Sequence, residues 1–120
     1  MLEKVNLAQK FALFTEPWRP RLVGEVNEAA VKLAKLRGEF LWHVHEAEDE
    51  LFLVVKGRLT IRLRDGEVHL APGELLIVPR GVEHQPVADG EAHVLLFEPS
   101  STLNTGNVAD GRTVRELERI

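Results

Sequence analysis

Seven glycines divide the middle of the chain into short segments, and their spacing is the strongest constraint on the fold. They lie 7 to 19 residues apart, at Gly24, Gly38, Gly57, Gly66, Gly73, Gly81 and Gly90. The segments between them are rich in Val, Leu, Ile and Phe. Short strands separated by regular turn signals are typical of all-β sandwiches and barrels. A chain of 120 residues has room for one such domain.

Local patterns place individual strands and turns in this middle region. Residues 58–64 alternate polar and apolar side chains, which predicts a strand with one buried face. Asp65-Gly66 and Asp89-Gly90 predict β-hairpins, because both central positions of a type I′ turn need positive φ. A two-residue loop at Asp65-Gly66 pairs Arg62 with His69, so we expect His69 on the outer face.

The ends of the chain and one internal segment are less regular. A short amphipathic helix is predicted over about residues 3–14, because three apolar side chains recur at i, i+4 and i+7, namely Leu7, Phe11 and Phe14. We expect this stripe to lie on the rest of the fold or on a partner subunit. Residues 28–36 have helical composition, but we expect a strand because an all-β context overrides a weak propensity. Residues 113–120 fit either a short helix or an added strand.

Composition excludes several kinds of site and partner. The chain has no cysteine, which excludes disulfides, thiolate catalysis and cysteine-ligated zinc or iron–sulfur centres. A formal net charge of -4 argues against binding nucleic acid. No apolar run approaches the roughly 20 residues of a membrane helix, and the N-terminus lacks the apolar core of a signal peptide. We therefore expect a cytoplasmic protein without nucleic-acid or membrane partners.

Residues 43–50, His-Val-His-Glu-Ala-Glu-Asp-Glu, carry most of the candidate chemistry. On a strand, His43 and His45 share a face and lie about 7 Å apart. If residues 46–49 form a hairpin loop, His45 pairs with Glu50, whose side chain then joins the same, otherwise apolar face. His84 follows a predicted Pro-Arg-Gly turn among apolar neighbours, so we expect it to face inward as well.

The alternation that points the histidines inward points their neighbours outward. Phe40, Trp42 and Val44 are then expected on the face opposite the ligands. An apolar outer face needs a cover. Together with the aromatic stripe of the N-terminal helix, it predicts a homodimer.

The candidate ligands fall into two motifs that match a known family. Gly38-(x4)-His43-x-His45-(x4)-Glu50-(x6)-Gly57 resembles the first motif of the cupin superfamily, and Gly73-(x5)-Pro79-x-Gly81-(x2)-His84 resembles the second. The resemblance covers roughly residues 33–99 and is to small single-domain bacterial cupins. It implies a jelly-roll β-barrel and a divalent transition metal held by His43, His45, Glu50 and His84.

With this fold, we expect an N-terminal helix and arm over residues 1–20 and a cupin barrel over residues 21–100. Residues 101–120 are then a C-terminal extension that packs on the barrel or on a partner subunit. The turn at Asn104-Thr105-Gly106 has no role assigned by the sequence.

The resemblance also implies a function. Imidazole and carboxylate ligands suit Zn, Mn, Fe, Ni, Co or Cu, and four protein ligands leave one or two open positions, as in catalytic sites. The implied chemistry is oxygenase- or isomerase-like and acts on a small molecule, with Glu50 also serving as a proton acceptor. A phosphate-bearing substrate is disfavoured, because the basic side chains are expected to alternate outward and the predicted inward faces hold no Lys or Arg cluster. The alternative is a non-catalytic cupin dimer that binds or senses a small molecule.

Overall fold

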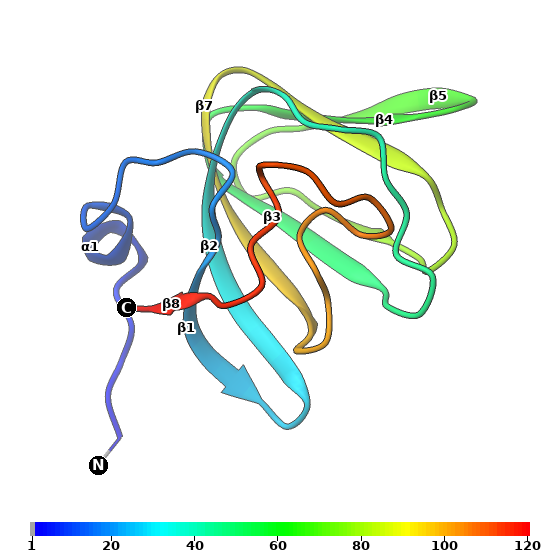
Figure 1. Ribbon diagram of the computed structural model, residues 1–120. Coiled ribbons are helices and arrows are strands. Elements are labelled where there is room, and N and C mark those ends of the chain that lie inside the picture. The colour runs from blue at the N-terminus through cyan, green and yellow to red at the C-terminus, as the bar shows by residue number, and fades with distance from the viewer. Residues whose placement is uncertain (1) are drawn as a thin grey trace.

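The computed structural model describes residues 2–120, in which one short helix precedes eight strands (Figure 1). The helix is α1 (Leu7–Phe11). The strands are β1 (Arg21–Val26), β2 (Ala29–Glu39), β3 (Glu50–Lys56), β4 (Leu59–Leu63), β5 (Gly66–Leu70), β6 (Leu75–Val78), β7 (His84–Pro99) and β8 (Glu118–Arg119).

Strand β7 lies at the centre of the sheet. Along one edge it pairs antiparallel with β2, and along the other it pairs with β4 near its beginning and with β3 near its end. The strand order is β5-β4-β7-β2-β1-β8, with β3 beside β7 and β6 beside β3. This arrangement confirms the predicted all-β jelly roll with a short N-terminal helix, although the sheet does not close into a full barrel.

Strand β2 forms despite its helical composition, as predicted. It lies between β1 and β7 and is covered on both faces, so residues 32–36 are buried in succession. Two lysines are among them. The Lys32 ammonium pairs with Glu98 at 3.0 Å, and that of Lys35 donates to the Phe14 carbonyl oxygen. Lys35 is on the outer face and is covered there by the N-terminal segment, but Lys32 shares the inward face with Ala34 and Leu36. The expectation that basic side chains alternate outward is therefore wrong for Lys32.

The β4–β5 hairpin has the predicted strands but a different register. Leu63 pairs with Gly66 and Thr60 with His69, so the two loop residues are Arg64 and Asp65. The predicted pairing of Arg62 with His69 is wrong by two residues. A shift of two preserves the face on which each side chain lies. His69 is therefore on the surface, as expected, with its side chain 71% exposed.

The hairpin predicted at Asp89-Gly90 is absent from the structure, because both residues lie inside β7. Opposite them, the pairing with β2 jumps from Leu36↔Ala92 to Gly38↔Ala88. Residues 89–91 of β7 therefore face only Arg37, which makes this site a β-bulge. A bulge uses the same turn-forming residues as a hairpin but lets the strand continue, here from its pairing with β4 to its pairing with β3.

The two ends of the chain pack together on the outside of the sheet. Helix α1 is shorter than predicted and begins after Asn6, whose side chain accepts a hydrogen bond from the Gln9 amide at 2.9 Å. Phe11 and Phe14 bury themselves against a group of sheet and C-terminal residues that includes Leu33 and Ile120. Of the two forms left open for residues 113–120, the structure has the strand: β8 pairs with β1 in parallel.

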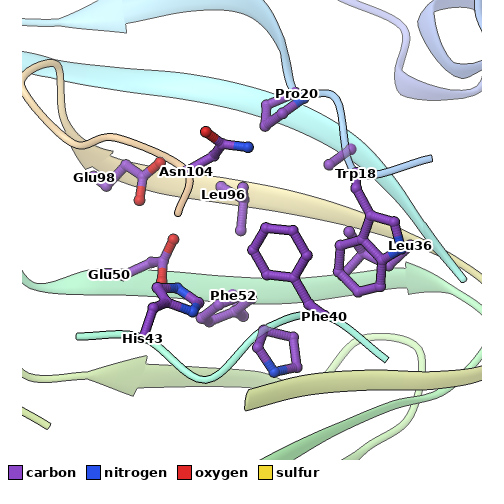
Figure 2. Close-up of a pocket in the computed structure, with 12 residues that line it drawn as sticks. Trp18, Pro20, Leu36, Phe40, His43, Glu50, Phe52, Leu96, Glu98 and Asn104 are labelled. Atoms are coloured by element: carbon purple, nitrogen blue, oxygen red, sulfur yellow. The ribbon is translucent and has the colours of Figure 1, made fainter. Parts of the chain in front are cut away.

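Phe40 is not on the outer face where the alternation places it. It is buried, its ring stacks on Trp18 with centroids 4.6 Å apart, and its edge contacts His43 (Figure 2). The reason is that residues 40–49 form no regular strand, so alternation does not hold there. Trp42 does remain outside, beneath the Arg64 guanidinium at 3.8 Å from the ring centroid.

Within residues 2–120, no helix has the length and apolar character needed to cross a membrane.

The homodimer remains a prediction, but the apolar surface that supports it differs from the expected one, which was formed by Phe40, Trp42 and Val44. Leu75 and Ile77 are each 54% exposed on β6, which pairs only with β3 in the described part of the chain. Covering such side chains stabilises an interface. We expect light scattering at micromolar concentration to give the mass of a dimer, and Ile77→Lys to shift it toward a monomer. A wild-type monomer under these conditions would contradict the prediction.

Candidate metal centre

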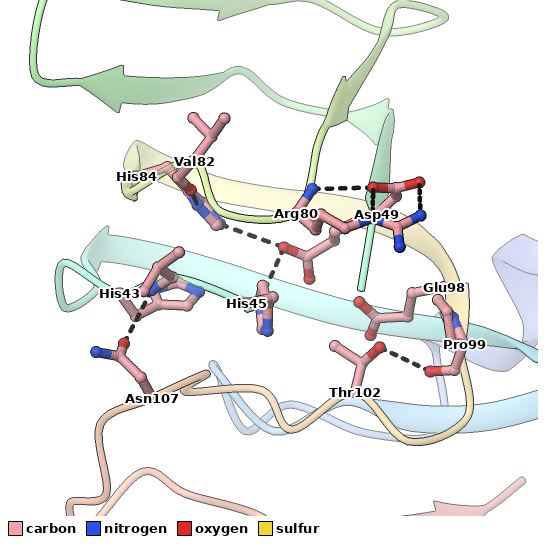
Figure 3. Close-up of polar contacts among 12 residues, drawn as sticks. His43, His45, Asp49, Arg80, Val82, His84, Glu98, Pro99, Thr102 and Asn107 are labelled. Atoms are coloured by element: carbon pink, nitrogen blue, oxygen red, sulfur yellow. Dashed lines mark hydrogen bonds and ion pairs between the residues drawn. The ribbon is translucent and has the colours of Figure 1, made fainter. Parts of the chain in front are cut away.

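Four buried side chains from three parts of the chain converge in one cluster. His43 and His45 lie on the irregular segment of residues 40–49, Glu50 begins β3, and His84 begins β7. One ligand atom from each lies within 4.8 Å of those of the others. Figure 3 shows the three histidines close to one another, and Figure 2 shows His43 beside Glu50. The structure thus brings together all four residues that the two motifs identified.

Backbone hydrogen bonds position these side chains. His43 and His84 form an isolated antiparallel bridge, in which each amide donates to the other's carbonyl oxygen at 3.0 and 2.9 Å. The Gly81 amide donates to the His45 carbonyl oxygen at 2.8 Å. The second motif is therefore bonded directly to the first.

The expected hairpin between His45 and Glu50 does not form. Glu50 pairs with Val78 of β6 instead. The side chains still converge, because His45 is held by the turn before His84 and not by β3. The four residues therefore converge as expected, although the pairing that was expected to bring them together is wrong.

The imidazoles are oriented for metal binding. Nδ1–H of His43 donates to the Leu41 carbonyl oxygen at 3.0 Å, and Nδ1–H of His84 donates to that of Val82 at 2.9 Å. Such bonds select the tautomer in which Nε2 is a free acceptor. In residues 2–120, the buried Nε2 of His45 has no hydrogen-bond partner. Nε2 of His45 and of His84 each lie 3.3 Å from Glu50 Oε1.

The environment favours the protonation states that metal ligands need. Burial and the neighbouring His84 lower the pKa of His43 to about 4, so its imidazole is neutral at pH 7. Burial alone would raise the pKa of Glu50, but interactions with the neighbouring His45 and His84 imidazoles outweigh it and the net shift is downward. Neutral imidazoles and an ionised carboxylate bind divalent transition metals. The donor set and the unpaired Nε2 of His45 therefore fit such an ion.

A cavity adjoins two of the four residues, His43 and Glu50, and has two different ends (Figure 2). About 40 Å³ of it is open to the centre of a water molecule. Its polar end is formed by His43, Glu50, Glu98 and Asn104. The apolar end is mainly aromatic and is formed by Trp18, Leu36, Phe40 and Phe52.

Glu98 is the residue of this site that sequence reasoning missed. One of its carboxylate oxygens pairs with Lys32, while the other, Oε2, is buried without a hydrogen bond in the described residues. Burial and the nearby Glu50 raise the pKa of Glu98. The sequence could have indicated this position, because Glu98 follows Val94 and Leu96 at every second residue of β7 and so lies on the same buried face.

The other two histidines lie outside the site. His69 bonds to Thr60 on the surface hairpin, with 3.0 Å between Nδ1 and Oγ1. His93 stacks on Phe11 of α1, with centroids 4.7 Å apart, and is not among the residues that line the cavity.

Comparison with known proteins agrees with the fold and the motifs. Residues 30–98 match the Cupin_2 family, described as the cupin domain. The chain belongs to this family. A cupin-2 domain protein from Shewanella frigidimarina has 43% identity and a TM-score of 0.78, over 79% of this chain and 93% of that one. A protein from Neisseria meningitidis has 30% identity and a TM-score of 0.75, over 82% of this cupin and 100% of that chain. YdbB of Bacillus subtilis is 47% identical over 45 residues, which span 38% of this chain and 40% of YdbB.

The first prediction from this geometry separates the histidines. We expect His43→Ala, His45→Ala and His84→Ala each to lose bound metal, because each removes a donor from a buried cluster. His69→Ala is the matched control and should keep its metal and its melting temperature, because its side chain is exposed. Elemental analysis and thermal melting measure both. A loss of metal in His69→Ala equal to that in His84→Ala would contradict the assignment.

The lowered pKa of His43 predicts how acid affects the metal-free protein. The folded state disfavours protonation, with a pKa of about 4 against an ordinary value of 6.5, so the unfolded chain binds more protons between these values. The free energy of unfolding is therefore highest above pH 6.5 and decreases as the pH falls toward 4. Between pH 7.5 and 5 we expect a decrease of about 2 kcal/mol. Urea unfolding at the two pH values measures it. In His43→Gln, the free energy of unfolding should no longer decrease by this amount between the two pH values. If it decreases as much as in the wild type, His43 is not the cause of the pH dependence.

Proposed function

We propose that this cupin holds one divalent transition metal per chain and acts on a small molecule by oxygenase- or isomerase-like chemistry. His43, His45, Glu50 and His84 are the proposed ligands. The observation that carries the proposal is the convergence of these four buried donors within 4.8 Å, with Nε2 of His45 lacking a hydrogen-bond partner in residues 2–120. Burying three imidazoles and a carboxylate is costly unless their polar atoms are paired.

The number of ligands supports a reactive centre over a closed structural one. Four protein donors leave one or two positions open on a five- or six-coordinate ion. A metal bound there would polarise a carbonyl group or activate dioxygen. Glu50 is also the proposed proton acceptor, because its carboxylate is ionised and lies at the wall of the cavity.

The cavity supports a small substrate without a phosphate group. Among the described residues, no Lys or Arg lines it. Lys32 is close by, but its ammonium is held by Glu98 and by the Thr102 carbonyl oxygen, at 3.0 and 3.3 Å. The unpaired Oε2 of Glu98 favours a hydroxyl or amino group at the polar end. The aromatic end favours an apolar body.

Elemental analysis of protein purified without a histidine tag tests the metal directly. We expect about one first-row transition metal per chain, either as purified or after incubation with Zn, Mn, Fe, Ni, Co or Cu. A protein that contains none and takes up none would overturn the proposal.

Water relaxation then separates an enzyme from a binding protein. We expect the Mn-loaded protein to enhance the relaxation of bulk water protons, because an open coordination position exchanges water. A loaded protein without this enhancement has a closed metal shell, which would support the non-catalytic alternative.

A further inference from the structure

We propose that residues 104–107 are a positioning loop, which holds the backbone between His43 and His45 and so sets the geometry of the metal site. This inference rests on the proposed metal function and extends it to residues beyond the cupin match, which ends at residue 98. It gives a role to the turn at Asn104-Thr105-Gly106, for which the sequence shows none.

The histidine segment, residues 40–49, has no strand of the described chain beside it on the edge that faces away from β7. Residues 40–49 form no strand, and His43 is bridged to His84 on one side only. Val44 lies between the two histidines. Its amide donates to Asn107 Oδ1 at 3.0 Å, and its carbonyl oxygen accepts from the Asn107 amide at 3.0 Å. Asn107 thus satisfies both backbone groups of Val44, as a neighbouring strand would.

Gly106 brings the positioning loop into contact with a ligand. Its φ is +58°, a left-handed conformation that glycine adopts readily. A Cβ at this position would lie 2.5 Å from the Val44 carbonyl oxygen and 3.0 Å from Cδ2 of His43. Any other residue would therefore push on the backbone between the two histidines and on the His43 ring.

The positioning loop is itself held in place. The Asn104 side chain accepts from the Val114 amide and donates to the Arg112 carbonyl oxygen, both at 2.8 Å. Thr105 is fully buried, and its hydroxyl bonds to that of Thr113 at 2.7 Å. Because these bonds close a loop over residues 104–114, Gly106 and Asn107 are presented to Val44 in one conformation.

This loop supplies no metal ligand, and its effect passes through the backbone of Val44. Outer groups that orient ligands change metal affinity by about 10- to 100-fold when they are removed. We expect an effect of that size from changing Asn107 or Gly106.

Substitutions at Asn107 give a matched test. Asn107→Ala removes the acceptor for the Val44 amide, whereas Asn107→Asp keeps it. Asn107 is exposed, so neither variant disturbs the core. We expect Asn107→Ala to weaken Zn binding about 10- to 100-fold in a chelator competition and to change the electron paramagnetic resonance spectrum of the Cu-loaded protein. Asn107→Asp should bind Zn at least as tightly as the wild type. Val108→Ala, the neighbouring exposed position, is the control and should match the wild type.

Gly106→Ala is the second variant and should weaken Zn binding by a similar factor, with a changed Cu spectrum. Wild-type affinity and spectrum in Asn107→Ala would overturn the positioning role. Equal losses in Asn107→Ala, Asn107→Asp and Val108→Ala would also overturn it, since they would indicate a general loosening of the loop. A wild-type protein that binds no metal would instead overturn the proposed function, so the two failures are distinguishable.

Discussion

The two backbone hydrogen bonds between His43 and His84 hold the candidate site together. They join the irregular segment after β2 to the first residue of β7, two parts of the chain that no hairpin connects. Both residues turn Nδ1 toward a nearby carbonyl oxygen, which leaves Nε2 directed at the cluster. His45 joins the cluster because the turn before His84 bonds to its carbonyl oxygen, and Glu50 is placed by the pairing of β3 with β6. The positions of the three histidines thus depend on this one junction.

Burial gives the site its electrostatic character. Three imidazoles and the Glu50 carboxylate are almost fully enclosed, and a second carboxylate, Glu98, lies at the wall of the same cavity. An unpaired buried charge costs several kcal/mol. Lys32 offsets part of this cost through its ion pair with Glu98. A divalent cation among the other four residues would offset much of the rest, which is the physical reason why the arrangement suits a metal.

The site also depends on residues outside the cupin match. Trp18 precedes the matched region and forms part of the aromatic end of the cavity by stacking on Phe40. The positioning loop follows the matched region and contacts the backbone between two proposed ligands. The shared domain thus carries the donors, while flanking residues shape the cavity and support the histidine segment. Such flanking contacts are where proteins with one fold can differ in function.

The sequence by itself determined the fold class and the four residues that converge. Glycine spacing and strand alternation sufficed for the fold class, because regular strands obey a local period of two. The two motifs sufficed for the four residues, although the segment that carries His43 and His45 is not a strand. The tertiary structure decided what that period cannot describe. Asp89-Gly90 became a bulge because β7 has partners on both sides of it, and Phe40 turned inward because its segment is not a strand. Lys32 is buried since both faces of β2 are covered, and its partner Glu98 lies 66 residues away in the sequence. The contact of Asn107 with Val44 spans a similar separation. Pairings over such distances depend on how the sheets pack, and no local pattern records them.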